Sequence, residues 1–208
     1  MHTEAFEAIA ATLKVAVAAL RDAEVPFALG GSFAAWARGG PEPQNDLDLM
    51  LKPGDAERAL EVLEQAGMRT ERPPEEWLFK AWHDRVMIDL IFCPAGLEMT
   101  DEVLARAETM PVLAVNTPVM AMEDMLVTKL RALDEHALDY TSLLGIARAL
   151  REQIDWNQLR ARSGDSPYAQ AFFTLVAELG IVEPPAGSSA SAHRRVRVVS
   201  GDAAAGTR

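Results

Sequence analysis

Three aspartates stand out as residues that could carry chemistry. Asp46 and Asp48 belong to the run Asp-Leu-Asp-Leu, and Asp89 interrupts the apolar run VMIDLIF. Side chains two apart on a strand point to the same face, so the first two predict a polar face on a strand. A buried acid without a partner costs on the order of 1–3 kcal/mol, so Asp89 needs one. It either shares a metal ion with Asp46 and Asp48 or forms an ion pair, for example with Arg38 or Lys80.

Magnesium is the cation that such carboxylates suggest. It binds through a few carboxylates together with phosphate oxygens and water. Two such ions roughly 3.5–4 Å apart suit an in-line phosphoryl displacement. We therefore expect a two-metal site at Asp46, Asp48 and Asp89. The alternative for the first two residues is the solvated face of an edge strand.

A glycine-rich turn precedes the first two acids. Gly30, Gly31 and Ser32 lie between a predicted strand, 27–31, and a predicted helix that starts at Ser32. Glycine lets the backbone approach a ligand closely. Ser32 is expected either to cap the helix or to bind a phosphate. A plain strand-to-helix turn would have the same sequence.

The remaining pattern predicts an α+β fold. Helical spacing of apolar residues runs over 3–24, and a hairpin turns at Asp84 and Arg85. Four predicted helical segments follow a predicted strand at 110–115. We expect a catalytic domain over 1–116, a helical domain over 117–182 that completes the active site, and a disordered tail over 183–208.

The net charge of the chain limits the kinds of molecule that it is expected to bind. The formal net charge is −11, and the stretch from Pro184 holds four arginines and one aspartate, so the rest carries −14. Such a body repels polyanions, because nucleic-acid binding rests on neutralised phosphates. A small-molecule acceptor fits this charge more easily than RNA. No stretch predicts a signal peptide or a membrane span, and we expect a cytoplasmic protein.

As an ordered set, these residues resemble the nucleotidyltransferase superfamily that includes DNA polymerase beta. The shared pattern is an apolar residue followed by glycines or serine, then acid–apolar–acid–apolar, then a third acid on a later strand. Here it reads Leu29-Gly30-Gly31-Ser32, the run 46–49, and Asp89. The resemblance implies a mixed β-sheet flanked by helices and followed by a C-terminal helical bundle. It also implies magnesium at the three acids and nucleotide binding at the glycine turn.

The second half is similar to AbiE/MenT-type toxin nucleotidyltransferases. In those proteins one helix carries a lysine in a KLxA run and the next helix carries an aspartate, which here are Lys129 and Asp139. Lys129 would contact the triphosphate, and Asp139 would orient Lys129 or deprotonate the acceptor. Without the resemblance, a snorkelling lysine and a helix N-terminal charge explain the two residues equally well. Arg38 would stand in for a basic residue that those toxins carry before the first metal acid.

The implied activity is transfer of a nucleoside monophosphate from a triphosphate to an acceptor hydroxyl. The toxin resemblance suggests the tRNA 3′ end as acceptor and a cognate antitoxin as partner. One alternative is an adenylyltransferase that modifies aminoglycoside- or lincosamide-like antibiotics. An alternative of another class is a non-catalytic nucleotide-binding or regulatory module.

Overall fold

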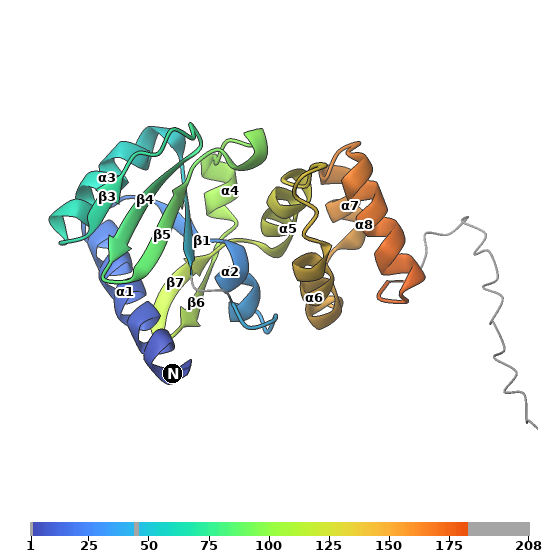
Figure 1. Cartoon of the computed structure of the whole chain (residues 1–208), viewed down its shortest axis with the longest axis horizontal. Helices are drawn as coiled ribbons and strands as arrows, with labels where there is room; N and C mark the ends of the chain where they lie inside the picture. Colours follow the sequence, from blue (N-terminus) through green and yellow to red (C-terminus); the bar gives the residue numbers. More distant parts are fainter. Residues whose placement is uncertain (1, 44–45, 183–208) are drawn as a thin grey trace, which may run out of the picture.

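The computed structural model describes residues 2–43 and 46–182, and it is built around one mixed sheet (Figure 1). The strand order is β3-β4-β5-β2-β1-β7-β6. The strands are β1 (Phe27–Leu29), β2 (Leu47–Leu51), β3 (Arg69–Glu71), β4 (Leu78–His83), β5 (Val86–Ile91), β6 (Glu108–Val112) and β7 (Val115–Val119).

The centre of this sheet carries the predicted acids. β2 pairs antiparallel with β1 and parallel with β5. β4 and β5 form the predicted hairpin through Asp84, whose φ of 54° places it in the left-handed region. The apolar residues of β2 and β5 are fully buried on one face, as Leu47, Leu49, Ile88 and Leu90 show. Their polar neighbours must therefore point to the opposite face.

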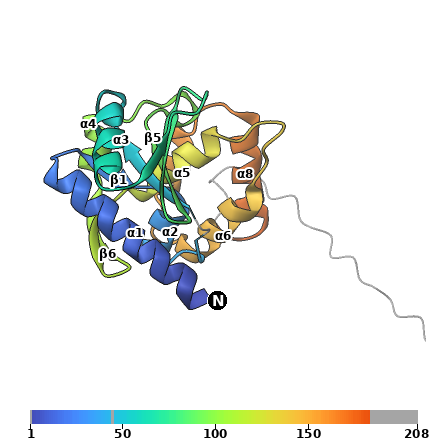
Figure 2. The same ribbon diagram turned by 60° about the vertical axis from the view of Figure 1, so that its left-hand side comes forward.

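Helices cover the sheet unequally. α1 (His2–Asp22) and α3 (Ala56–Gln65) pack against each other and against strands of the sheet. In Figures 1 and 2 they lie together on the side away from the C-terminal helices. α2 (Gly31–Ala37) contacts β2 and α5, so it lies between the sheet and the C-terminal helices. A 3-10 turn (Pro53–Asp55) leads from β2 into α3, and a second 3-10 turn (Pro94–Gly96) and the short α4 (Asp101–Ala105) lie between β5 and β6.

The C-terminal helices form a second cluster beside the sheet (Figure 1). They are α5 (Met122–Arg131), α6 (Tyr140–Leu150), α7 (Trp156–Arg162) and α8 (Pro167–Glu178). A buried carboxylate ties this cluster to the body: Asp124 of α5 binds Arg106, just after α4, at 2.8 Å and also Arg162 of α7. In the described part of the chain, no helix is both long and apolar enough to span a bilayer.

The predicted α+β fold with a helical C-terminal part is confirmed, and two details were wrong. The strand predicted at 110–115 is a hairpin, β6 and β7, that turns at Leu113 and Ala114, both with positive φ. The helix predicted to start with a Ser32 cap begins at Gly31, with Gly30 at the cap position. The domain boundary at 116 stays a prediction, although this position lies inside β7. The predicted tail, 183–208, lies outside the described residues.

Candidate active site

The glycine turn is built around the carboxylate of Asp48. Gly31 has φ +56°, and a β-carbon added there would lie 1.6 Å from Oδ2 of Asp48. The backbone N–H of Gly30 donates a hydrogen bond of 2.8 Å to the carbonyl oxygen of Asp48. At position 31, only glycine allows both the positive φ and the close approach to the carboxylate of Asp48. The turn therefore places bare backbone directly against an acid.

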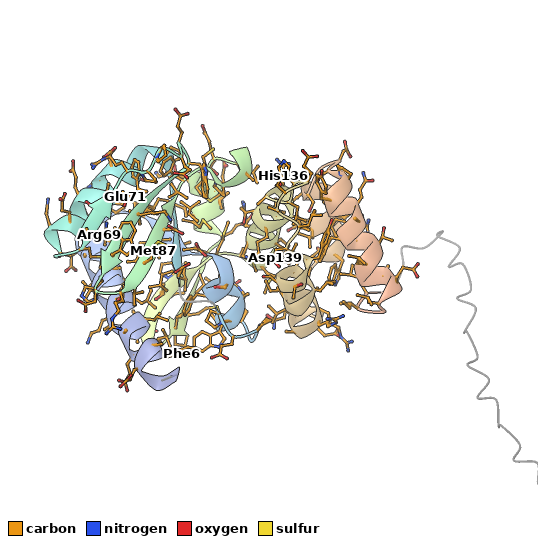
Figure 3. The ribbon with its side chains drawn as sticks, viewed as in Figure 1. Phe6, Arg69, Glu71, Met87, His136 and Asp139 are labelled. Atoms are coloured by element: carbon orange, nitrogen blue, oxygen red, sulfur yellow. The ribbon has the colours of Figure 1, made fainter. Side chains whose placement is uncertain are left out.

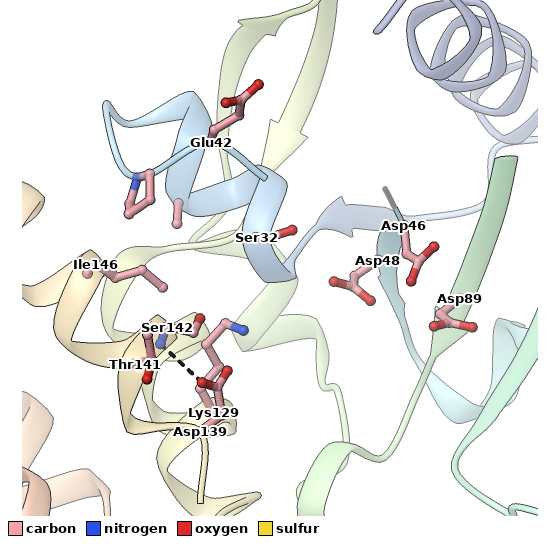
Figure 4. A pocket seen from close by; sticks show the side chains of 13 residues that line it. Ser32, Glu42, Asp46, Asp48, Asp89, Lys129, Asp139, Thr141, Ser142 and Ile146 are labelled. Carbon is pink, nitrogen blue, oxygen red and sulfur yellow. Dashed lines mark hydrogen bonds between the residues drawn. The ribbon is translucent and has the colours of Figure 1, made fainter. Parts of the chain in front are cut away.

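Two of the three predicted acids are register partners. Asp48 on β2 lies directly beside Asp89 on the parallel strand β5. Register partners on adjacent strands share a face, so both carboxylates point away from the buried core face. Asp46 is exposed and comes just before β2 begins. Figure 4 shows the three side chains converging on one region.

Asp89 also has the partner that sequence reasoning offered as an alternative. Nζ of Lys80, on β4, lies 2.8 Å from Oδ1 of Asp89. These residues are register partners across the β4–β5 hairpin. The carboxylate of Asp89 thus lies between an ammonium group and a second carboxylate.

This arrangement makes the carboxyl group of Asp48 harder to ionise. Its pKa is raised to about 6, chiefly because the carboxyl is buried and next because the charge of Asp89 lies close. The ammonium groups of Lys129 and Lys80 act in the opposite direction, and Asp46 adds to the rise. A buried group that resists ionisation beside other acids marks a place where a bound cation would be stabilised.

A cavity of about 370 Å³ opens in front of the acids, bounded on the far side by α5 and α6. All three acids line it together with Ser32, Lys129 and Asp139. Asp139 caps α6, since its Oδ1 accepts a hydrogen bond of 3.1 Å from the backbone N–H of Ser142. Figures 3 and 4 show Asp139 at the side of the helical cluster that faces the sheet.

A second cavity of about 750 Å³ meets the first at Asp48 and Lys129. Gly31, Trp77 and Arg131 also line it, and Trp77 is one of the few large apolar side chains that are exposed. Ligand pockets commonly span about 300–1,000 Å³, so each cavity has room for a small molecule. Two cavities that share an acid and a lysine offer space for two reactants.

Arg38 is placed elsewhere. It is not among the residues that line either cavity. Its guanidinium instead donates to the carbonyl oxygen of Met120 at 3.1 Å and to Glu108 at 3.4 Å, which links α2 to the β6–β7 hairpin. The predicted role of Arg38 in nucleotide binding therefore stays a prediction that this placement does not support.

The carboxylates at the cavity wall are the side chains that could hold a divalent cation. Carboxylate oxygens are ligands that magnesium prefers, and Asp46 and Asp48 offer them at the cavity wall. Within 2–43 and 46–182, however, no three or more acidic, His or Cys side chains are grouped closely enough to hold one metal ion.

A sequence model of the family described as "Uncharacterised nucleotidyltransferase" matches residues 8–179 of the chain. The chain belongs to this nucleotidyltransferase family. The matched range contains the glycine turn, the three acids, Lys129 and Asp139. The predictions of a nucleotidyltransferase fold and of an enzyme are confirmed, while the closer likeness to AbiE/MenT-type toxins stays a prediction. No curated protein matches the sequence.

Solved structures agree with this nucleotidyltransferase fold. The crystal structure of ANT(2″)-Ia in complex with adenylyl-2″-tobramycin matches with a TM-score of 0.56 and 15% identity, covering 81% of this chain and 98% of that one. The solution structure of the antibiotic-resistance factor ANT(2″)-Ia also has a TM-score of 0.56, at 14% identity, with 82% and 94% covered. At such identities the likeness concerns the fold alone.

Proposed function

We propose that this nucleotidyltransferase moves a nucleoside monophosphate from a nucleoside triphosphate to a hydroxyl of a small cationic acceptor, with magnesium as cofactor. The observation that carries the proposal is the pair Asp48–Asp89, on adjacent parallel strands beside Gly31 and open to a cavity. Burial and the neighbouring charge of Asp89 raise the pKa of Asp48, although the ammonium group of Lys80 lies beside Asp89. The cation of a metal-complexed triphosphate would offset this negative charge when the triphosphate binds.

Asp46 and Asp48 would hold the magnesium ion. The ion, when bound, supplies positive charge that neutralises phosphate oxygens during transfer. Lys129 lines both cavities, and we assign it to the triphosphate, where an ammonium group would offset the charge of the leaving pyrophosphate. Asp139 is engaged in capping α6, so we assign it the positioning of the helix rather than a contact with the phosphates.

In the reaction itself, the acceptor oxygen would attack the α-phosphorus in line. Its proton would pass to the carboxylate of Asp89, and the bond between the α-phosphorus and the bridging oxygen would break. Pyrophosphate then carries away the electron pair of that bond. Most of the rate enhancement would come from holding the two reactants in line and from stabilising charge.

The charge of the cavity supports a cationic acceptor. Five acids line it, namely Glu42, Asp46, Asp48, Asp89 and Asp139, against one basic residue, Lys129. The net charge of −11 for the whole chain has the same sign. A polyamine sugar such as an aminoglycoside is attracted by this field, and an RNA end is repelled. The structural neighbour ANT(2″)-Ia, whose crystal structure contains adenylyl-2″-tobramycin, supports the same direction.

The test is a transfer assay with each of the four α-labelled nucleoside triphosphates and magnesium. Parallel reactions contain a panel of aminoglycosides, a panel of lincosamides or bulk tRNA. We expect label to join a cationic small molecule. Label on tRNA instead would contradict the acceptor class and favour the toxin-type reaction and a cognate antitoxin as partner. If calorimetry detects no magnesium-dependent triphosphate binding, the chain is better described as a non-catalytic module.

A further inference from the structure

Three charged side chains lie in a row across β4, β5 and β2. Lys80 is opposite Asp89 in the antiparallel pair, and Asp89 is beside Asp48 in the parallel pair. Register partners point to the same face of a sheet. Asp89 therefore lies in the middle of the row, between the ammonium group of Lys80 and the carboxylate of Asp48.

The ammonium group of Lys80 is held in place rather than free to move. Its Nζ lies 2.8 Å from Oδ1 of Asp89 and 3.6 Å from Sδ of Met87. The side chains of Lys80 and Asp89 are 26% and 16% exposed, so the ion pair is mostly shielded from water. A charge pair in such a setting is stronger than one on the surface, and separating it leaves two poorly solvated charges.

This pairing competes with a metal ion at Asp89. A second divalent cation would have to displace the ammonium group or sit close to it, which adds repulsion between like charges. The described residues offer no group of three or more acidic, His or Cys side chains placed to share a metal. Around Asp48, by contrast, negative charge is in excess: Asp89 is its register partner, and Asp46 lines the same cavity.

We propose that the site takes one divalent cation, at Asp46 and Asp48, and that Lys80 supplies the second positive charge, on Asp89, in place of a second metal ion. This inference rests on the proposed function and replaces the two-metal arrangement expected from sequence. Lys80 is then a positioning residue: it fixes the carboxylate of Asp89 beside the cavity.

The test counts bound manganese. Full-length protein is dialysed against Mn²⁺ alone, and bound ions are counted by electron paramagnetic resonance, which also reports coupling between neighbouring ions. We expect one ion per chain, no Mn–Mn coupling, and the same count in Asp89→Asn. Lys80→Met frees the carboxylate of Asp89 and should double the count, whereas Lys80→Arg keeps the charge and should leave it at one.

Two further variants control this count. Lys52→Met removes a lysine that pairs with Asp55 and Asp101 and lines neither cavity at the acids, so the count should stay at one. Lys80→Met combined with Asp89→Asn should also bind one ion, because the released carboxylate is gone. Should Lys80→Met not fold, the wild type and Asp89→Asn still decide the question.

Two coupled ions in the wild type, falling to one in Asp89→Asn, would overturn this inference and leave the proposed reaction standing. No bound ion in the wild type would overturn this inference, while the proposed reaction, in which the ion can arrive with the triphosphate, is tested by the transfer assay. An unchanged count of one in folded Lys80→Met would also refute the substitution of lysine for metal.

Discussion

The α-carbon of Gly31 approaches the carboxylate of Asp48 so closely that any side chain would collide with it. An added β-carbon would lie 1.6 Å from Oδ2 and 2.6 Å from Cγ of Asp48. Real β-carbons do not approach other heavy atoms this closely, so backbone or carboxylate would have to move. The glycine turn and the acid thus form one structural unit, and changing either member should disturb the site.

Gly31→Ala should abolish transfer and lower stability. The left-handed φ of +56° alone costs a non-glycine residue about 1–2 kcal/mol, and the collision with Asp48 adds to it. Activity and urea unfolding of the variant measure both effects. Gly54→Ala is the matched control, because nothing lies within 4 Å of its added β-carbon. A Gly31→Ala enzyme as active as Gly54→Ala would refute the close packing.

Asp48→Asn should stabilise the metal-free protein, and more so at neutral than at acidic pH. The pKa of Asp48 in the folded protein is about 6, against an ordinary 3.8. The folded state therefore binds the proton more tightly than the unfolded chain, and this group lowers stability as pH rises from about 4 through 6. Removing the charge should gain on the order of 2 kcal/mol at pH 7.5 and less at pH 5. Urea unfolding in chelator at both pH values measures the gain; an equal gain at both would contradict it.

Asp124→Ala should loosen the attachment of the helical cluster. Asp124 is 3% exposed and binds Arg106 and Arg162 from two other segments. Both arginines are partly exposed, so water can solvate them once Asp124 is removed. We expect the free energy of unfolding, measured in urea, to fall by about 2 kcal/mol. Glu152→Ala, which removes an exposed partner of Arg151, should cost close to nothing. Equal effects of the two variants would show that the buried contact does not join the parts.

Lys129→Met should slow transfer by about 10²–10³-fold, the usual effect of removing one group that stabilises developing charge. Lys129 lines both cavities and acts on Asp48 electrostatically. Steady-state kinetics of the purified variant check this expectation, with the exposed Lys14→Met on α1 as control. If Lys129→Met kept the wild-type kcat and KM, Lys129 would be a snorkelling residue only.

Much of the candidate site could be predicted from the local sequence. Spacing by two predicted that Asp46 and Asp48 share a face, and the interrupted apolar run predicted that Asp89 needs a partner. The hairpin at Asp84 even fixes which residue lies opposite Asp89, because counting back from the turn reaches Lys80. What spacing could not decide was whether that partner is a lysine or a metal. This depends on how three strands come together in space.

Other features were hidden for identifiable reasons. β7 contains Pro118, and proline argues against a strand when sequence is read alone. β3 is only three residues long and polar, so it has no apolar alternation to detect. The hydrogen-bond partner of Arg38 could not be predicted either, because the carbonyl group of Met120 lies far along the chain.

The central claim is that the acids at the meeting of β2 and β5 carry nucleotidyl transfer. Its most direct test is release of pyrophosphate from labelled triphosphate, in the presence of the acceptor found in the transfer assay, by wild type, Asp48→Asn and Asp84→Asn. Asp84 lies at the hairpin turn, where asparagine also tolerates positive φ, so its variant should match the wild type. We predict that Asp48→Asn folds normally and loses about 10²–10³-fold or more of the rate. A folded Asp48→Asn enzyme with the wild-type rate would contradict the account.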